Sequence, residues 1–388
     1  MKPKEILVVT NYFPPERGAA SNRIFSLVDQ LQKNHHQVTV VCPFPNYPHG
    51  TLFDGFKGKI YQKKSAEFGT IHRLWVWPSN SSNTFIRLLS MISFSISLVF
   101  FFLFRRSPKK VIIQYSPIFV GFTAVFWSRL LGKKVVLNVS DLWPLAGLEM
   151  GLLQKGFYYN LLTKMEHYCY RKSQLIIGQS QEILDHVKQK QLNIPLFLYR
   201  NFPDFKPAMP TKRTESNEIK IVYAGLLGVA QGLHSICSKI EWPEHISLHL
   251  YGTGPEKEAI QQLESKHIVY HGEIERKLLH IELQKYDLAL IPLVKRIYGS
   301  VPSKIFELAR IGLPLLYFAG GEGEQLVLNH HLGWNVAHSD TEALQTFITE
   351  IQVEQIEKFS KVKIQETALK NFSLDDQFEK FNMRLEEL

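Results

Sequence analysis

The sequence is poor in cysteine and has no cysteine pair at metal-binding spacing. Its 388 residues include three cysteines, Cys42, Cys169 and Cys237, which lie far apart without a CxxC pair. This pattern argues against a disulfide framework and a zinc site and suits a reducing cytoplasm. We interpret the histidine pairs His35–His36 and His330–His331 as surface or core residues rather than ligands. We therefore expect neither a metal ion nor another cofactor.

The sequence also lacks a dense lysine and arginine run, zinc-finger spacing and an aromatic RNA-binding signature. The net charge of +9 favours anionic partners, but nucleotide phosphates and anionic lipids are anionic as well as nucleic acids. Without those motifs we expect no nucleic-acid binding. The chain begins directly with a predicted strand, in MKPKEILVVT, so we expect no signal peptide.

The length and the strand pattern predict two domains. A chain of 388 residues is long for one core and suggests two domains of about 190 residues each. Apolar strands alternate with helices in both halves, which is typical of parallel sheets covered on both faces. The predicted strands are Ile6–Thr10, Val38–Cys42, Ile71–Val76, Val111–Gln114, Val135–Val139 and Leu175–Gly178, then Ile219–Ala224, Ser247–Tyr251, Ile268–His271, Leu288–Ile291 and Leu315–Phe318. Between the halves, Asn201–Glu218 is rich in proline and charge and reads as a boundary loop. We predict an α/β fold of two doubly wound domains, 1–200 and 201–373, which face each other across a cleft.

One stretch, Leu88–Phe104, has seventeen residues without a charge and has basic residues on both sides. Three readings are open: a buried helix, a helix whose exposed apolar side enters the inner leaflet, and a transmembrane span. A span needs ~20 predominantly apolar residues, and this stretch is shorter and contains four serines. A crossing would also prevent the next strand, within Val111–Pro117, from joining the sheet of Ile6–Thr10. In the second reading, Arg105 and Arg106 contact lipid headgroups.

Ligand-binding chemistry is suggested first by Gly299–Pro314, which reads GSVPSKIFELARIGLP. It predicts a helix that begins near Lys304 and ends at Gly312. A helix N-terminus offers free N–H groups and a positive dipole end, which suit nucleotide phosphates. Glu307, one turn in, could accept hydrogen bonds from both hydroxyls of a ribose. Ser303 either donates to a phosphate or caps the helix, and the alternative for the whole motif is a capped helix with solvated charges.

Glycine-bearing loops follow several predicted strands. Gly225 and Gly228, in Ala224–Gly232, would let backbone amides approach phosphates closely, or they form a plain turn. Gly252 and Gly254 precede a predicted helix, and we expect that loop to line the base and ribose side of the cleft.

A further loop carries an acid after the predicted strand Val135–Val139. Asp141, in the sequence Asp-Leu-Trp-Pro, could accept a proton, orient a ligand hydroxyl, or close a turn into Pro144.

In the order and spacing of these motifs, the chain resembles the family 4 retaining glycosyltransferases. It is most similar to bacterial transferases of surface polysaccharide synthesis, including the N-acetyl-fucosamine transferases. The resemblance extends over nearly the whole length. It rests on motifs that follow one another in order, within Ile6–Leu31, His35–Gly50, Val135–Pro144, Ile221–Leu233 and Leu248–Ile260 and then in Gly299–Pro314. It implies the GT-B fold and a final helix, 374–388, that returns to the N-terminal domain.

The resemblance also implies roles for the loops. The Gly225–Gly228 loop would hold the donor diphosphate, with Gln231 in place of the basic residues that many relatives carry. The positive charge would then come from Lys304, helped by Lys295 or Arg296. The glycine loop of the N-terminal domain would face the donor phosphate through Gly18. Its neighbour Arg17, or alternatively Arg23, would offset charge on the leaving group.

The chain departs from the family at two positions. Of the Glu-x7-Glu signature, Glu307 matches the second glutamate, whereas the first falls on Gly299. In the family the first glutamate helps place the donor sugar, so its absence bears on the sugar contacts and not on ribose binding. Many relatives have a His-Asp pair where this chain has Ser140 and Asp141. No Asp-x-Asp triplet is present, which fits metal-independent transfer.

We therefore predict a glycosyltransferase that moves a sugar, an N-acetylated amino sugar, from a UDP donor to a lipid-linked saccharide acceptor in capsule or O-antigen synthesis. We predict that it is cytoplasmic and peripheral on the inner face of the cell membrane. Two alternatives are a nucleotide-sugar epimerase of the same architecture and a membrane-associated scaffold without catalytic activity. Nucleotide binding separates the scaffold from the enzymes, and consumption of an acceptor separates transferase from epimerase.

Overall fold

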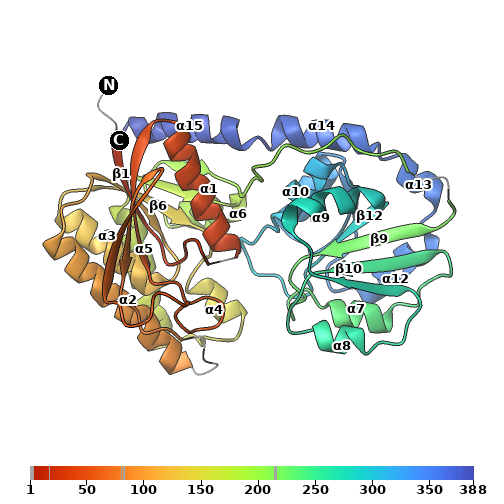
Figure 1. The fold of residues 1–388 in the computed structure, drawn as a ribbon, viewed down its shortest axis with the longest axis horizontal. Helices are drawn as coiled ribbons and strands as arrows, with labels where there is room; N and C mark the ends of the chain where they lie inside the picture. The colour runs from red at the N-terminus through yellow and green to blue at the C-terminus, as the bar shows by residue number, and fades with distance from the viewer. Residues whose placement is uncertain (1–3, 17, 80, 82–83, 214–215) are drawn as a thin grey trace. The chain divides into compact units, whose positions relative to one another are not determined.

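The computed structural model describes residues 4–16, 18–79, 81, 84–213 and 216–388, which form two compact units (Figure 1). Unit 1 comprises Met1–Arg200 together with Asp375–Leu388, and unit 2 comprises Asn201–Leu374. Each unit contains one sheet with helices on both faces. The prediction of two parallel-sheet α/β domains is confirmed.

Unit 1 is built on a sheet of eight strands in the order β3-β4-β2-β1-β5-β6-β7-β8. All neighbouring pairs are parallel except β3 and β4, which are antiparallel. The central strands are buried valine, isoleucine and leucine runs, as expected for a parallel sheet covered on both faces. The strands are β1 (Lys4–Val9), β2 (His36–Pro43), β3 (Tyr61–Ala66), β4 (Gly69–Leu74), β5 (Lys110–Gln114), β6 (Lys134–Val139), β7 (Leu175–Gly178) and β8 (Leu196–Leu198).

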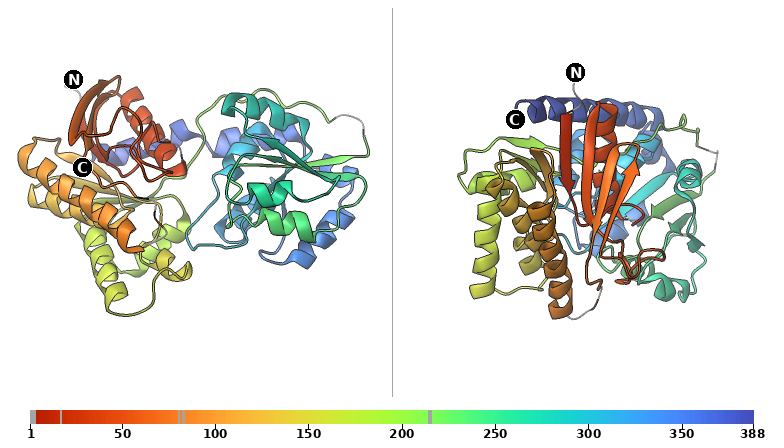
Figure 2. Two further views of the ribbon diagram at one scale, coloured as in Figure 1. Left: turned by 60° about the horizontal axis from the view of Figure 1, so that its bottom comes forward. Right: turned by 60° about the vertical axis from the view of Figure 1, so that its left-hand side comes forward.

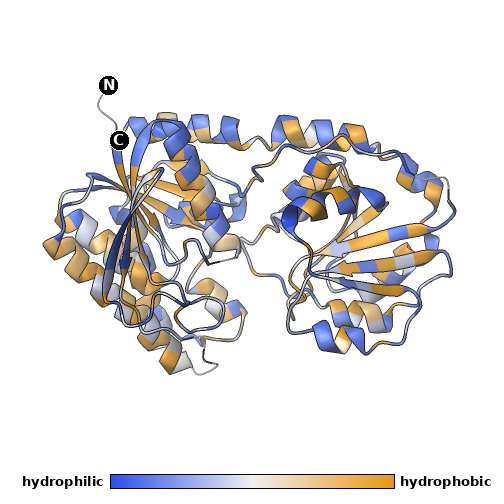
Figure 3. Ribbon diagram, viewed as in Figure 1, coloured by the Kyte–Doolittle hydropathy of each residue, from blue (hydrophilic) through white to orange (hydrophobic). Residues whose placement is uncertain are grey.

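The helices of unit 1 connect these strands and pack on both faces of the sheet (Figure 2). Helix α3 packs against both α2 and α5, and all three expose apolar side chains to solvent (Figure 3). The helices are α1 (Ala19–Lys33), α2 (Thr84–Phe104), α3 (Ile118–Leu130), α4 (Leu145–Glu149), α5 (Phe157–Lys172), α6 (Gln181–Gln189) and α15 (Leu374–Glu386).

Helix α2 contains the uncharged stretch, and it is apolar on two faces. One face buries side chains such as Phe94 and Phe101, while the other exposes Phe100 at 57% and Phe104 at 75%. Two of its serines contact the segment after β4: Ser97 Oγ donates to the carbonyl of Trp75 at 2.8 Å, and Ser93 Oγ accepts from the Trp77 N–H at 2.8 Å. The helix is therefore buried on one side, as in the first reading, and has an exposed apolar side, as in the second. In the described part of the chain, no helix is both long and apolar enough to cross a membrane.

Unit 2 is built on a six-stranded parallel sheet in the order β11-β10-β9-β12-β13-β14. Alternate residues of β9 point to opposite faces, so that Ile221 joins one apolar core and Val222 joins the other. The strands are β9 (Ile219–Ala224), β10 (Ile246–Tyr251), β11 (Ile268–Gly272), β12 (Leu288–Pro292), β13 (Leu315–Phe318) and β14 (Gly333–Asn335).

The helices of unit 2 complete these two cores. They are α7 (Leu233–Lys239), α8 (Lys257–Gln261), α9 (Arg276–Glu282), the 3₁₀ helix η1 (Leu283–Lys285), α10 (Lys304–Ile311), α11 (Glu322–Asn329), α12 (Thr341–Glu350), α13 (Val353–Glu357) and α14 (Lys361–Asn371).

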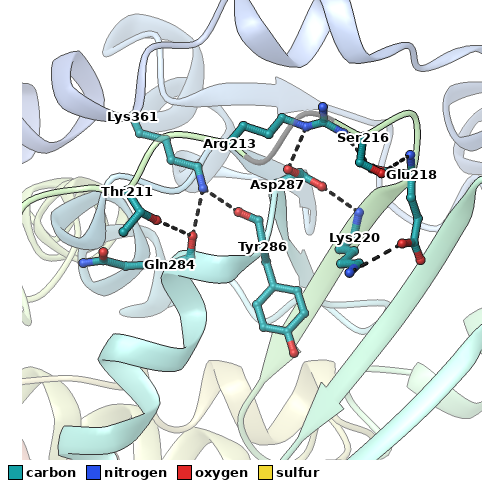
Figure 4. A network of polar contacts seen from close by, with 9 residues as sticks. All are labelled: Thr211, Arg213, Ser216, Glu218, Lys220, Gln284, Tyr286, Asp287 and Lys361. Atoms are coloured by element: carbon teal, nitrogen blue, oxygen red, sulfur yellow. Dashed lines mark hydrogen bonds and ion pairs between the residues drawn. The ribbon is translucent and has the colours of Figure 1, made fainter.

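The segment that enters unit 2 is fixed by a polar network (Figure 4). Asp287 accepts hydrogen bonds from Arg213 Nε at 2.9 Å and from the Lys220 N–H at 2.8 Å. Lys361, at the start of α14, donates to the carbonyls of Gln284 and Tyr286 at 3.1 and 2.7 Å. The network thus joins the segment that enters unit 2, the residues just before β12 and the start of α14.

The last helix, α15, belongs to unit 1, where Phe378, Phe381 and Leu385 are buried. It is fixed to the end of β8 by the Gln377 side chain, which accepts from the Arg200 N–H at 2.8 Å and donates to the Arg200 carbonyl at 3.0 Å.

Most predicted strands lie within one or two residues of the observed ones, and β3, β8 and β14 were not predicted. Strand β3 is polar and largely exposed at the sheet edge, so it lacks an apolar pattern. Strands β8 and β14 have three residues each and also lie at edges. The predicted strand Ile71–Val76 begins two residues earlier, at Gly69, where it pairs with β2.

Candidate active site

The helix predicted within Gly299–Pro314 exists as α10, Lys304–Ile311. Its buried side, which includes Ile305 and Phe306, packs toward the sheet. The helix ends at Gly312, whose φ of 91° is left-handed, and the Leu313 N–H reaches back to the Leu308 carbonyl at 3.1 Å. The capping interpretation of Ser303 is wrong, because its side chain makes no cap hydrogen bond. The N–H groups of Ile305 and Phe306 instead donate to the backbone carbonyls of Pro302 and Ser303, both at 3.2 Å.

Glu307 is held from two sides. Its Oε1 accepts a hydrogen bond from His280 Nε2 at 2.9 Å and pairs with Arg276 Nη2 at 3.2 Å. Its Oε2 lies 3.8 Å from Lys304 Nζ. Burial would raise the pKa of Glu307, but the His280 hydrogen bond and the charges of Lys304 and Arg276 together lower this pKa to about 2. The carboxylate is therefore ionised and oriented, with Oε2 as the less occupied oxygen.

Sequence reasoning missed Arg276 and His280, which both come from α9. Their positions differ by four, so they share one helix face, and this spacing was the available signal. The ring of Phe205 stacks on His280 with centroids 4.0 Å apart, and it also lies below Arg310. A segment just after the boundary between the halves thus fixes the histidine that orients Glu307.

Lys304 lies directly over the first glycine of the Ala224–Gly232 loop. A Cβ atom at Gly225 would lie 2.6 Å from Lys304 Cε, so a larger residue there would have to displace the end of the lysine side chain. The lysine side chain is 28% exposed, and partial burial lowers its pKa, while the charge of Glu307 acts in the opposite direction. The structure thus brings the predicted residues Gly225, Lys304 and Glu307 together.

A pocket of about 310 Å³ adjoins this group. It is lined by the ends of β9, β10 and β11, by the loops that follow them and by α9, through Gly225, Leu226, Tyr251, Gly252, Thr253, Glu273, Ile274 and Leu279. Gly252 is needed for backbone packing, since a Cβ there would lie 1.9 Å from the Gly225 carbonyl oxygen. Gly254 does not line the pocket and instead packs against the backbone of Leu227. The two glycines therefore have different surroundings.

The other predicted donor-loop residues form a turn beside the next loop. The Gln231 N–H donates to the Gly228 carbonyl at 3.0 Å, and the Val294 N–H donates to Ala230 at 3.0 Å. Gln231 Oε1 is buried without a hydrogen-bond partner among the described residues. Lys295 is exposed in the loop that follows β12. Lys295 is therefore accessible to a ligand at this turn, whereas Gln231 Oε1 is closed off from solvent.

In unit 1, Gly18 precedes α1 and lines a pocket of about 230 Å³ with Tyr12 and Glu16. Glu16 is buried, and its Oε1 accepts from the N–H groups of Asn46 and Tyr47 at 2.9 and 3.0 Å. This carboxylate joins the loops that follow β1 and β2. The predicted residue Arg17 lies outside the described residues.

Asp141 follows β6 and is exposed. Ser140 Oγ donates to Asp141 Oδ2 at 3.2 Å. The alternative cation, Arg23, is 6% exposed and donates to Gln179. Burial lowers the pKa of Arg23, and the Asp141 carboxylate acts against this shift. Asp141 therefore has a positive charge in its surroundings and access to solvent.

Among the described residues, no group of three histidine, cysteine or carboxylate side chains could hold a metal ion.

Two domain families match the chain. The glycosyl transferase 4-like domain matches residues 18–195, and the glycosyl transferases group 1 domain matches residues 218–352. A search of curated proteins finds no match.

Solved structures resemble the chain over nearly its whole length. Sucrose-phosphate synthase from Thermosynechococcus elongatus has a TM-score of 0.76 at 11% identity, over 99% of this chain and 98% of that one. HepE from Anabaena in complex with UDP has a TM-score of 0.68 at 11% identity, over 99% and 100%. The lipopolysaccharide outer core galactosyltransferase WaaB has a TM-score of 0.62 at 13% identity, over 99% and 100%. At these identities the likeness establishes the fold.

Proposed function

The chain belongs to the glycosyltransferases of the GT-B fold, and on this premise we propose that it transfers an N-acetylated amino sugar from a UDP donor to a lipid-linked glycan precursor. Transfer would be retaining and metal-independent and would serve capsule or O-antigen synthesis. Both matched families are glycosyltransferase domains, which favours the transferase over the epimerase and the scaffold.

The observation that carries the proposal is the group formed by Gly225, Lys304 and Glu307 beside the 310 Å³ pocket. An ionised carboxylate with one less occupied oxygen suits ribose hydroxyls, and the adjacent pocket suits a base. The lysine and the positive dipole end of α10 suit a diphosphate. HepE, which has the same fold, was solved with UDP and with UDP-glucose, which supports a uridine nucleotide here.

Transfer requires stabilisation of a diphosphate that gains negative charge as it leaves. A lysine held next to the phosphates in a partly buried site stabilises that charge without reorganisation. We propose this role for Lys304, with Lys295, Gln231 and the positive dipole end of α10 as further contributions. Asp141 would accept the proton of the acceptor hydroxyl or orient an acceptor sugar.

The lipid-linked acceptor and the membrane location are supported by the surface of α2. Its exposed phenylalanines, Phe100 and Phe104, are followed directly by the exposed Arg105 and Arg106. Apolar rings beside cations suit the interface of an anionic bilayer. We propose that this end of α2 binds the inner face of the cell membrane.

The decisive experiment is a mass-spectrometric screen of nucleotide sugars with a lipid extract and the purified protein. A new lipid-linked glycan together with free UDP would support the proposal. A changed nucleotide sugar without acceptor would support the epimerase, and absence of nucleotide binding would support the scaffold.

A further inference from the structure

The carboxylate of Asp141 is connected to a buried cation by a hydrogen-bond chain. Ser140 Oγ donates to Asp141 Oδ2 at 3.2 Å. The Ser140 carbonyl in turn accepts from Gln179 Nε2 at 2.6 Å, and Gln179 Oε1 accepts from Arg23 Nη1 at 2.5 Å. The hydrogen-bond chain therefore runs from α1, through the residue after β7, to the loop after β6.

The sheet brings the two loops of this hydrogen-bond chain together. Strands β6 and β7 are parallel, and their register pairs Val139 with Gly178. Ser140 and Gln179 are therefore the first residues beyond two neighbouring strand ends. A glutamine amide both accepts and donates hydrogen bonds, so it can join a guanidinium on one side to a carbonyl on the other.

The cation at the far end has no carboxylate in contact. Arg23 is 6% exposed, and its Nε and Nη2 are buried without a hydrogen-bond partner among the described residues. A buried charge without a counter-charge is costly. The Asp141 carboxylate supplies a counter-charge at longer range, because it opposes the lowering of the Arg23 pKa by burial. Arg23 and Asp141 are thus linked by charge as well as by hydrogen bonds.

Asp141 itself faces open space. It is exposed, and it lines a cavity of about 560 Å³ together with Tyr12 and Trp143. An exposed carboxylate can adopt several staggered side-chain conformations. Ser140, in contrast, is 5% exposed, and the Gln179 amide fixes its backbone. A fixed Ser140 hydroxyl therefore restricts the direction in which Asp141 points.

We propose that Gln179 is a positioning residue that fixes the Ser140 loop and so aims the Asp141 carboxylate at the acceptor hydroxyl, with Arg23 as its anchor. This inference rests on the proposed function, in which Asp141 accepts the acceptor proton or orients the acceptor. It makes that role specific, because it names the groups that hold the carboxylate in place. Arg23 then acts on Asp141 rather than on the leaving group.

The test measures UDP release from UDP-N-acetylglucosamine by the full-length protein with a lipid extract, at varied donor concentration. Gln179→Leu should lower kcat about tenfold or more, because a misplacement of ~1 Å at a reacting group can cost about 10²-fold. Gln179→Glu should do the same, since a glutamate accepts from Arg23 but cannot donate to the Ser140 carbonyl. It also keeps the buried cation paired if the leucine variant fails to fold. The donor KM, and the UDP affinity measured by calorimetry, should stay within about twofold of the wild type.

Two further measurements separate positioning from a purely structural role. When Asp141→Asn is already present, Gln179→Leu should cause no further loss of kcat, because both changes act through the same carboxylate. Hydrogen exchange of residues 140–143 should rise in Gln179→Leu, since the loop loses its hydrogen bond to β7. Gln181→Leu is the matched control, because Gln181 is exposed on α6 and bonds Asp185 of the same helix at 2.9 Å. It should leave kcat and exchange within about twofold of the wild type.

Three outcomes would overturn the inference: unchanged kcat in both Gln179 variants, a full additional loss in the double variant, or equal effects of Gln179→Leu and Gln181→Leu. If the wild type binds UDP but does not use this donor, hydrogen exchange decides, and unchanged exchange in Gln179→Leu would overturn the inference. An Asp141→Asn variant as active as the wild type would contradict the proposed role of Asp141 instead. Absence of UDP binding in the wild type would contradict the proposed function.

Discussion

At the residue scale, Glu307 connects the local electrostatics to the proposed nucleotide site. Three cationic or donor groups surround it, and all come from α9 or from its own helix. Because Oε1 is already occupied by Arg276 and His280, a ribose would meet mainly Oε2. The neighbours thus determine which oxygen is available.

Glu307→Gln should weaken UDP binding about tenfold or more, because charge-assisted hydrogen bonds contribute roughly 1.5–3 kcal/mol. Calorimetry measures this effect directly. Glu354→Gln, at an exposed site on α13, is the control and should leave affinity unchanged. Unchanged affinity in a folded Glu307 variant would contradict the ribose assignment.

Lys304→Ala should lower kcat by about 10²–10³-fold, with a smaller rise in the donor KM, because the diphosphate gains charge in the transition state. Steady-state kinetics with a varied donor separate the two parameters. Lys363→Ala, exposed on α14, is the control. A change confined to KM would make Lys304 a ground-state anchor.

Acid should remove stability that Glu307 contributes. Its pKa is about 2 in the folded protein against an ordinary value of 4.5. A lowered folded pKa stabilises above the unfolded value, and this stabilisation is lost as the pH falls toward the folded value. The free energy of unfolding of unit 2 should therefore fall by about 2 kcal/mol between pH 5 and pH 3 through this group. Denaturant titrations should give a flatter pH profile for Glu307→Gln, and parallel profiles would refute the assignment.

At the element scale, α2 shows what an apolar sequence can and cannot specify. The run predicted a helix, and the helix is present. The sequence left its burial open, because both faces are apolar and only packing against α3 and the sheet decides which side is covered. Likewise, Glu307 and Lys304 were predicted from one motif, whereas Arg276 and His280 approach from another helix. Their contact depends on the tertiary fold, which local sequence patterns do not encode.

The exposed end of α2 should bind anionic vesicles. Phe100→Ser with Phe104→Ser should release the protein, and so should Arg105→Glu with Arg106→Glu, since each basic residue near an anionic surface contributes about 1 kcal/mol. Vesicle flotation at low and high salt measures both. The neighbouring Phe101 and Phe102 are buried, so they are left unchanged.

The matched control for the phenylalanine pair is Leu328→Ser with Val362→Ser, two exposed apolar residues of unit 2. This variant should float like the wild type. If the wild type itself stays unbound at low salt, α2 is not a membrane contact and the acceptor is soluble.

At the scale of the whole molecule, the last helix completes the first unit. Phe381 is fully buried and contacts Phe197, Tyr199 and Phe378. Phe381→Ala should destabilise unit 1 by about 3–5 kcal/mol without changing UDP affinity. Hydrogen exchange resolves the two units. Phe372→Ala, which removes a buried ring from unit 2, is the mirror control and should increase exchange there. We expect each substitution to increase hydrogen exchange only in its own unit. Increased exchange in both units of the Phe381 variant would contradict this expectation.

The placement of α15 also has a consequence for synthesis on the ribosome. Unit 1 needs Asp375–Leu388, yet these residues are translated after all of Asn201–Leu374. At 5–20 residues per second, the nascent unit 1 waits for roughly 10–35 s with the site of Phe378 and Phe381 uncovered. During this interval, unit 2 can finish folding first, although its coding region comes second. We therefore expect unit 2 to complete its fold before unit 1 does, and the nascent unit 1 to be the form most in need of a chaperone.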